Sequence, residues 1–497
     1  MPGVVVSTAV RTGPSAATVR ESSQLFVVGL AERGPTDEAI LVQSLADFEF
    51  NFGGYISDSY LHPTVEAFFE EGGTQCYVSR VVGAGATTGT LALKNSASVT
   101  VLTIDADGPG AWSSNVTAVV ETVSAGVSFR VKINYDGALV YSTGTVTSVA
   151  QAAGRINTSP LASRYVIATA TDGATTLPVA GTFTVSAGDS AHATATPTSH
   201  AAVYVTGLEK FSDALGTGAV CVPDAEGGTA VGTFTISEAL IAHANTYNRI
   251  AIIHAGKADT STYAKTKAAQ LQAEDGSEHA ALYFPWIDVP TSITGVSRRI
   301  PPDGYVAAKR ALAHNQTGPH VPAAGLVSAA LYAIGTAVDI DKTTGDDLDV
   351  NFVNAIRIIQ NTIRIYGARS LSADEDNFRF ITSQDVVNTV VTEAYRSLED
   401  LVFTAIDGRQ TVYASISSRL TAICARLAED GALFASYGVN GAEIDPGYTV
   451  RCDSSLNPVA QLAGGTIKAK VGLRASSVGD KIEVDITKSS LTSSVTQ

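Results

Sequence analysis

The chain has 497 residues, a length that predicts about two to four domains. Hydrophobic residues make up 45% and charged residues 16%, which is enough apolar content for folded cores and excludes bulk disorder. The net charge of -15 repels a phosphate backbone, and no stretch reaches the roughly 18 apolar residues of a membrane span. Residues 1–7 lack the basic start of a signal peptide. We therefore expect no nucleic-acid partner and no direct insertion into a membrane.

An extended arm over residues 1–20 is the first expected element, and its β-prone run consists of Val4, Val5 and Val6. After the arm, strands are expected over 25–30 and 76–82 because short apolar runs there end at turn residues. A helix between them ends at Gly72-Gly73.

The composition changes over residues 85–205, which contain only 11 charged residues. Thr, Ser, Val, Ala and Gly dominate, and short β-prone runs alternate with Gly, Asp and Asn turns. This region is predicted to be an inserted, peripheral β-rich domain.

Alternation of helices and strands returns after about residue 206. Strands over 249–255 and 280–286 flank a helical stretch over 260–273, which predicts a βαβ unit with a right-handed crossover. Residues 21–84 and 206–365 are therefore expected to form one α/β core domain around the insertion.

Two long amphipathic helices are expected in residues 366–480. The first follows Thr382-Ser383-Gln384-Asp385, which has the form of a capping box. Its apolar residues are expected on one face: Val386, Val390, Val391, Ala394, Tyr395, Leu398, Leu401 and Val402. The second helix has its own apolar face: Val412, Ile416, Leu420, Ile423 and Leu427.

Strands are expected after these helices, over 447–452, 466–471 and 481–486. The last strand alternates Ile482, Val484 and Ile486 with charged residues, a pattern typical of a half-exposed strand. Residues 481–497 are thus a C-terminal strand and tail. The expected fold class is a multidomain α+β or α/β protein with a βαβ-containing middle domain, an inserted β-rich domain, and a C-terminal domain of two long helices and a β-sheet.

Motifs for catalysis or cofactor binding are incomplete. Gly83–Gly89 follows a strand, but its third glycine comes one position late and no helix follows it. Asp339–Asp349 imitates a calcium loop without the glycine at position six or the glutamate at position twelve, where Val350 stands. The four cysteines lie far apart and predict buried thiols in a reducing compartment (Cys76, Cys221, Cys424 and Cys452). We therefore expect no catalytic residue, no cofactor and no metal site.

Several short segments follow one another along the sequence in an order that is informative about its family. The segments are Pro2–Val6, Phe26–Pro35, Ser44–Gly54, Phe68–Val81, Asp107–Asn115, Ile300–Ala307, Ile365–Leu371 and Asp430–Ile467. Each is weak alone, but their order resembles the contractile tail sheath family of bacteriophages and related injection systems. Residues 405–408 depart from that family, which has Phe-x-Pro-Asn at this point.

The resemblance implies a structural subunit, not an enzyme, with a sheath-type C-terminal domain. It implies stacked hexameric rings of this chain around an inner tail tube, with baseplate and tail terminator proteins as further partners. The location would be a virion tail that is assembled in the host cytoplasm. Both terminal strands would then join neighbouring subunits by adding to a sheet whose expected residues are Tyr448, Val450, Ile467 and Val471.

Two other functions stay open on the sequence alone. The 85–205 region favours a non-contractile, β-rich surface protein. The βαβ unit over 249–286 favours a Rossmann-like enzyme, although the phosphate-binding loop of such an enzyme is missing.

Overall fold

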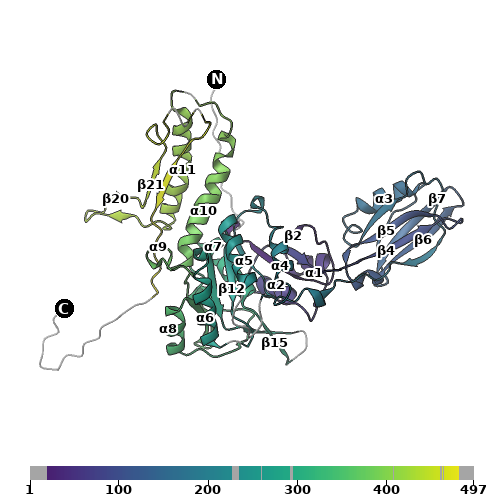
Figure 1. Ribbon diagram of the computed structural model, residues 1–497, viewed down its shortest axis with the longest axis horizontal. Helices are drawn as coiled ribbons and strands as arrows, with labels where there is room; N and C mark the ends of the chain where they lie inside the picture. Colours follow the sequence, from purple (N-terminus) through teal and green to yellow (C-terminus); the bar gives the residue numbers. More distant parts are fainter. Residues whose placement is uncertain are drawn as a thin grey trace, which may run out of the picture.

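The computed structural model describes residues 20–225, 234–258, 260–291, 295–406, 408–458, 462 and 464–480. Figure 1 shows a central α/β body, a β-rich part that extends to one side, and a helical part with a small sheet that rises from the body. The mixed α/β, multidomain class predicted from the sequence is confirmed. The two terminal strands, with Val4, Val5 and Val6 in one and Ile482, Val484 and Ile486 in the other, lie outside the described residues.

An eight-stranded mixed sheet forms the centre of the body. Its strands follow the order β2 (Ala39–Val42), β3 (Cys76–Val81), β1 (Leu25–Leu30), β11 (Ala219–Cys221), β12 (Ile250–His254), β13 (Ala280–Phe284), β17 (Val353–Ile359) and β18 (Thr362–Tyr366). Neighbours are parallel except in the outermost pairs, β2–β3 and β17–β18. The predicted βαβ unit is confirmed, since α6 (Ser261–Leu271) connects the parallel strands β12 and β13.

Helices cover both faces of this sheet, which explains why its inner strands are continuous apolar runs. Leu25 and Val27 of β1 point to one apolar cluster, with α1 (Leu45–Phe52), α2 (Leu61–Glu70) and α7 (Asp303–Gln316). Phe26 and Val28 point to the other, with α4 (Ala201–Leu208), α5 (Thr235–Tyr247), α6 and α8 (Lys342–Val350). Tyr204 of α4 belongs to this second cluster, although the sequence grouped it with the insertion.

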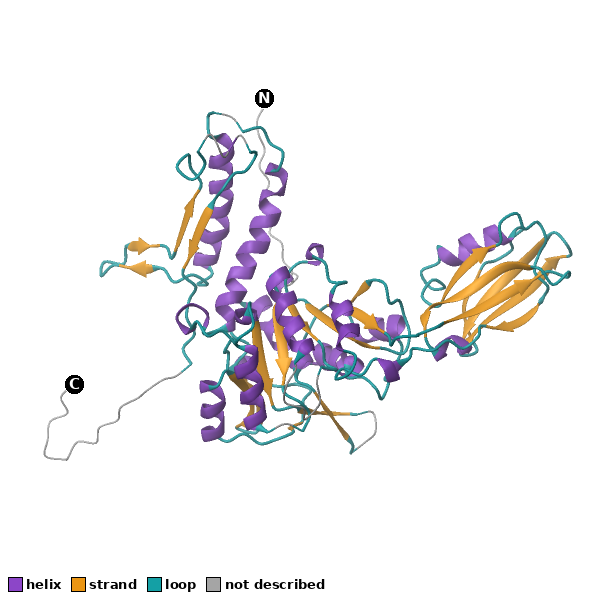
Figure 2. Ribbon diagram, in the orientation of Figure 1, coloured by secondary structure: helices purple, strands orange, loops and turns teal. Residues whose placement is uncertain are grey.

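The β-rich part seen in Figure 2 has its own apolar core. One sheet has the order β4 (Thr88–Lys94), β5 (Thr100–Pro109) and β9 (Val166–Ala170). The other has the order β10 (Gly181–Thr184), β6 (Val116–Ser124), β7 (Ser128–Tyr135) and β8 (Ala138–Ser142). All these pairs are antiparallel, and α3 (Val149–Asn157) contributes to the same core.

A buried arginine anchors the β-rich part to the body. Arg80, at 0% exposure, donates to the carbonyl oxygens of Gly34 (2.6 Å) and Pro109 (2.7 Å) and to Ser190 Oγ (3.0 Å). Burial lowers its pKa to about 10, so the guanidinium stays charged at pH 7. Gly108 has φ +106°, and a Cβ there would lie 2.3 Å from the carbonyl oxygen of Gly34. The backbones therefore meet at a closely packed neck that needs glycine.

The remaining strands form small sheets. β14 (Ile287–Pro290) pairs with β15 (Ser297–Ile300) and with β16 (Gly335–Thr336) beside the body. In the C-terminal part, β19 (Ser436–Tyr437) pairs with β20 (Glu443–Asp445), and β21 (Tyr448–Arg451) pairs with β22 (Lys470–Leu473).

Candidate functional site

Two helices carry the C-terminal part of the chain. α10 (Ile381–Leu398) and α11 (Thr411–Glu429) contact each other, and α11 buries every apolar residue predicted for its inner face. On α10, Val386 and Val390 are buried, whereas Val391 and Tyr395 are 41% and 64% exposed. The prediction of one apolar face on α10 is thus wrong for Val391 and Tyr395, because the part of α10 that α11 covers is narrower than the apolar pattern. It is also wrong for Leu401 and Val402, which lie beyond the end of α10 at Leu398, and Val402 is 54% exposed.

The capping box predicted at residues 382–385 does not form. α10 begins at Ile381 after Phe380, which makes no side-chain cap, and Thr382 Oγ1 has no hydrogen-bond partner among the described residues. Asp385 has a stronger partner elsewhere, since its carboxylate accepts from the guanidinium of Arg310 on α7. A charged hydrogen bond to a side chain from another part of the chain outweighs the local motif.

The hydrogen-bond cluster around Asp385 joins three distant parts of the chain at the base of α10. Arg310 also donates to the carbonyl oxygen of Ser22, 288 positions away, and His314 Nδ1 lies 3.0 Å from Ser22 Oγ. Burial alone would raise the pKa of Asp385, but Arg310 and His314 outweigh it and hold the pKa below its usual value. Burial and Arg310 lower the pKa of His314, so its imidazole is neutral at pH 7. No sequence spacing could have revealed this cluster.

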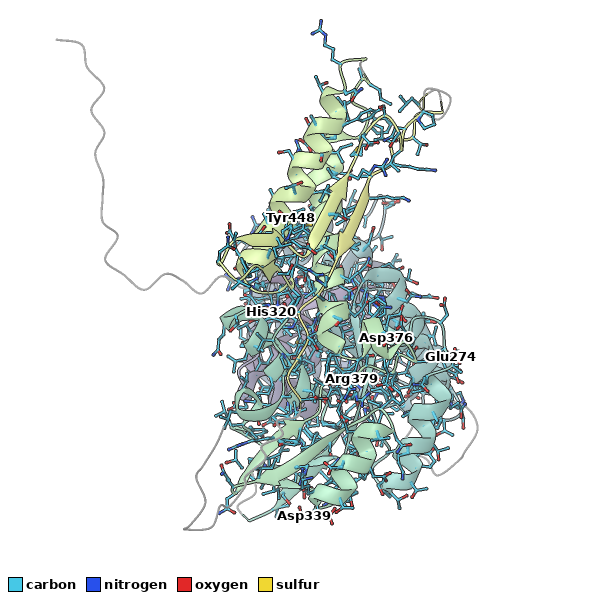
Figure 3. The ribbon with its side chains drawn as sticks, turned by 90° about the vertical axis from the view of Figure 1, so that its left-hand side faces the viewer. Glu274, His320, Asp339, Asp376, Arg379 and Tyr448 are labelled. Atoms are coloured by element: carbon cyan, nitrogen blue, oxygen red, sulfur yellow. The ribbon has the colours of Figure 1, made fainter. Side chains whose placement is uncertain are left out.

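The two-stranded sheet β21–β22 packs against α11 (Figure 3). Tyr448 lies opposite Leu473 and Val450 opposite Val471. Tyr448, Val450 and Leu473 pack against the apolar clusters of the two helices, while Val471 is 36% exposed. Among the described residues this sheet has two strands, so each strand has one edge without a strand partner.

The last predicted residue of this sheet, Ile467, lies before β22, which begins at Lys470. Asn457, only 2% exposed, explains the later start. Its side chain accepts from the Lys468 N–H at 2.6 Å and donates to the Lys468 carbonyl at 2.9 Å, so both backbone groups are taken. Ile467 instead packs against the apolar cluster of α11.

The outer face and the ends of this sheet are polar. Thr449, Arg451 and Lys470 are exposed. Asp445, just before β21, accepts from the Gly447 N–H and from Arg474, and these contacts lower its pKa.

Both ends of the described chain lie near this C-terminal part. The Arg20 N–H donates to Asn315 Oδ1 at 2.9 Å, and Glu21 forms an ion pair with Arg396 on α10. At the other end, Asp480 accepts from Arg379, at 2.8 Å, just before α10. In Figure 3 the labelled Tyr448 lies on the small sheet and Arg379 nearer the body.

A second place that could hold a ligand lies where β1 and β11 diverge, because open parallel sheets bind ligands at such switch points. Asp224 after β11 is buried there, and it accepts from Ser59 Oγ (2.8 Å), Tyr60 N (2.6 Å) and Leu30 N (3.3 Å). Burial raises its pKa to about 6. Since the carboxylate accepts hydrogen bonds from elements of the body, its observed role is to join them.

Other chemistry is sparse in the described part of the chain. It contains no group of three or more His, Cys, Asp or Glu residues that could hold a metal ion. Its helices include none long and apolar enough to cross a membrane. The four cysteines are buried free thiols, as predicted.

No protein-family model and no curated protein matches this sequence. Solved structures do match its fold. The sheath tail protein from Listeria innocua aligns with a TM-score of 0.60 and 12% identity, over 88% of this chain and 90% of that chain. The sheath of PVC, an extracellular contractile injection system, in its contracted state aligns with a TM-score of 0.55 and 15% identity, over 98% of both chains.

A third similar structure is the contracted helical sheath of the anti-feeding prophage. Its TM-score is 0.54 and its identity 14%, over 98% of this chain and 99% of that chain. The fold of these solved structures thus confirms, over nearly the whole length of the chain, the resemblance seen in the ordered motifs. This protein has the fold of contractile sheath proteins.

Proposed function

We propose that the chain is a structural subunit of a contractile sheath, which polymerises around an inner tube and shortens to drive that tube through a cell envelope. The observation that carries this proposal is the sheath fold over about 98% of the chain. The sheath-type part is residues 366–480, the core is 21–84 with 206–365, and the β-rich insertion over 85–205 is peripheral.

The edges of β21 and β22 that have no strand partner among the described residues are the proposed attachment points for neighbouring subunits. An unpaired strand edge either aggregates or accepts another strand. The donors are Val4, Val5 and Val6 from one neighbour and Ile482, Val484 and Ile486 from another. Tyr448, Val450 and Val471 belong to the accepting sheet, and Ile467 supports it from the adjacent apolar cluster.

The charge pattern supports the C-terminal strand as one donor. With Ile482, Val484 and Ile486 turned toward α11, the intervening residues Glu483 and Asp485 face outward, on the side where Arg451 and Lys470 are exposed. Opposite charges on one face of neighbouring strands stabilise a sheet by about 0.2–1 kcal/mol per pair.

Contraction in this proposal needs no cofactor and no catalytic residue. Subunits move as rigid bodies from a metastable extended array to one of lower free energy, and strands shared between neighbours keep the array connected. The partners are further copies of this chain in stacked hexameric rings, the inner tube, and the baseplate and tail terminator proteins. The site of action is the tail of a virion or of a phage-like injection particle, after assembly in the cytoplasm.

Electron microscopy of the purified chain tests the proposal. We expect the wild-type chain to form tubes. The triple variant Ile482→Asp, Val484→Asp, Ile486→Asp should remain a folded monomer. Addition of this strand would bury three carboxylates against α11, which is too costly. Truncation of residues 1–19 should have the same effect.

A matched control places the same three charges further along the tail. Ser489→Asp, Ser490→Asp, Ser493→Asp should still form tubes. If the wild-type chain stays a monodisperse monomer at high concentration, the sheath function is contradicted. If the triple variant at Ile482, Val484 and Ile486 still forms normal contractile tubes, only the role of this strand is contradicted.

A further inference from the structure

An apolar segment beside the core sheet is held open to solvent. Residues 321–338 contain no charged side chain. Leu326, Leu331 and Ile334 project from this segment with exposed fractions of 76%, 74% and 61%. The segment crosses from the end of α7 to β16, outside the C-terminal sheet and the β-rich insertion.

A buried carboxylate fixes the middle of the segment. Glu71, at 0% exposure, accepts from the backbone N–H groups of Leu331 (2.8 Å), Tyr332 (2.8 Å) and Ala333 (3.0 Å). Lys309 Nζ lies 2.8 Å from the same carboxylate and balances its charge. Three charge-assisted hydrogen bonds to consecutive residues leave this backbone little freedom.

The flanking backbone is also bonded to the body. The Ala330 N–H donates to the Ile363 carbonyl at 2.9 Å, and Ser328 Oγ bonds to both the N–H and the carbonyl of Ile365. These contacts cover part of the edge of β18, the last strand of the core sheet. A partner therefore meets this surface through side chains and not by adding a strand to the sheet.

We propose that Leu326, Leu331 and Ile334 form a contact surface for a second copy of this chain. The inference rests on the sheath function and adds a contact between subunit bodies to the strand exchange at the termini. A rigid apolar surface that stays exposed is typical of an interaction site, because burying it costs little conformational entropy.

The net charge of the chain favours a second copy of this chain as the partner at the uncharged segment 321–338. Each subunit has a net charge of -15, so two copies repel each other wherever their charged surfaces meet. An uncharged segment is where two such bodies approach at the least electrostatic cost. A basic partner would be recognised by carboxylates and an anionic membrane by Lys or Arg, and the segment has neither. A contact between this patch and a different patch on the next copy closes into a ring or extends as a helix, depending on the rotation between the copies, and an array of stacked rings allows both.

A pair of matched substitutions tests the contact. Leu331→Asp should raise the concentration needed for tube formation about tenfold or more, because a charge replaces a buried apolar contact. Leu139→Asp, on β8 of the insertion, is the control, since Leu139 is 60% exposed and lies in the part proposed to be peripheral. It should change that concentration by less than about twofold. Thermal unfolding should be the same for both variants and wild type.

Cross-linking gives an independent readout. The native cysteines are buried, so Leu331→Cys supplies the one accessible thiol of the described residues for a benzophenone label. Illumination of labelled tubes should yield a product of twice the subunit mass that joins residue 331 to a peptide of this chain. Tubes of normal size from Leu331→Asp, or labelled tubes that cross-link only to another protein or not at all, would overturn the contact alone. Failure of the wild-type chain to form tubes would overturn the sheath function and this contact with it.

Discussion

Charged side chains inside this protein are held by backbone groups from several parts of the chain. The guanidinium of Arg249, at 0% exposure, donates to the carbonyl oxygens of Phe211 (2.8 Å), Ser212 (2.6 Å) and Gly216 (3.0 Å). It also lies 4.0 Å from the centre of the Phe26 ring. Such residues fix loops onto the sheet at the cost of burying a charge, so their removal leaves several acceptors unpaired.

His243 is the titrating partner of Arg249. Its Nε2 lies 2.8 Å from Arg249 Nη1 and accepts from it, and burial together with this cation lowers the pKa of His243 to about 3. The unfolded chain binds this proton near pH 6.5, but the folded chain does not. Stability from this residue is therefore present above pH 6.5 and is lost as the pH falls toward 3.

The variant His243→Gln should show this linkage. The amide oxygen can still accept from Arg249, so stability at pH 7 should change by less than about 1 kcal/mol. Between pH 6.5 and pH 5 the free energy of unfolding of the wild type should fall by about 2 kcal/mol more than that of the variant. One proton that binds only the unfolded chain lowers this free energy by about 1.36 kcal/mol per pH unit. Urea unfolding at several pH values measures both slopes, and parallel slopes would show that His243 does not titrate this way.

At the scale of single elements, the small sheet β21–β22 depends on one side chain outside it. Asn457 bonds both backbone groups of Lys468 and donates to the Asp453 carbonyl at 3.0 Å. These three bonds direct the chain into β22 and hold it beside α11. A sheet of two strands is marginal by itself, so this support matters for the whole accepting surface.

Replacement of Asn457 by alanine should loosen β22 without unfolding the body. We expect a loss of about 1–3 kcal/mol in the local opening free energy, because three hydrogen bonds, two to the backbone of Lys468 and one to the Asp453 carbonyl, are lost together. Hydrogen exchange of the amides in Lys470–Leu473 should then become faster, and the variant should form tubes less readily. Asn440→Ala, at an exposed turn between β19 and β20, is the control and should leave the exchange of β22 unchanged.

At the scale of the whole molecule, the β-rich insertion forms a separate core that joins the body at one neck. The Gly83 N–H donates to the Ser190 carbonyl at 2.9 Å, so the entering and leaving backbones lie next to each other. Arg33 adds a contact from the body to the insertion, with its guanidinium 4.6 Å from the Tyr165 ring centre. An insertion with its own core and adjacent ends can be removed with little strain on the remainder.

Deletion of residues 84–189 with a short Gly/Ser bridge should therefore give a soluble, folded chain. If the insertion is peripheral in the sheath, as we propose, this shortened chain still forms tubes, now of smaller outer diameter. Circular dichroism and electron microscopy measure the two outcomes. A folded product that forms no tubes would show that the insertion makes contacts the assembly needs.

The sequence by itself determined the elements whose signal is local. Continuous apolar runs predicted β1, β12 and β13, the helical period predicted the buried face of α11, and turn-rich, weakly charged sequence predicted that the insertion is rich in strands. These features follow from neighbouring residues, since burial on one or two sides imposes a period on the chain. The ordered motifs likewise led to the correct fold.

Only the tertiary structure decided how these elements are joined. Asp385 accepts from Arg310 instead of taking part in the predicted capping box. Asn457 binds the backbone of Lys468, so β22 begins later than predicted. Glu71 binds the backbone of an apolar segment that is far away in sequence. Each outcome depends on a charged or amide group that finds its partner only after the chain has folded. A hydrogen bond between distant residues leaves no period in the sequence, so the anchors of the candidate interface could not be read from it.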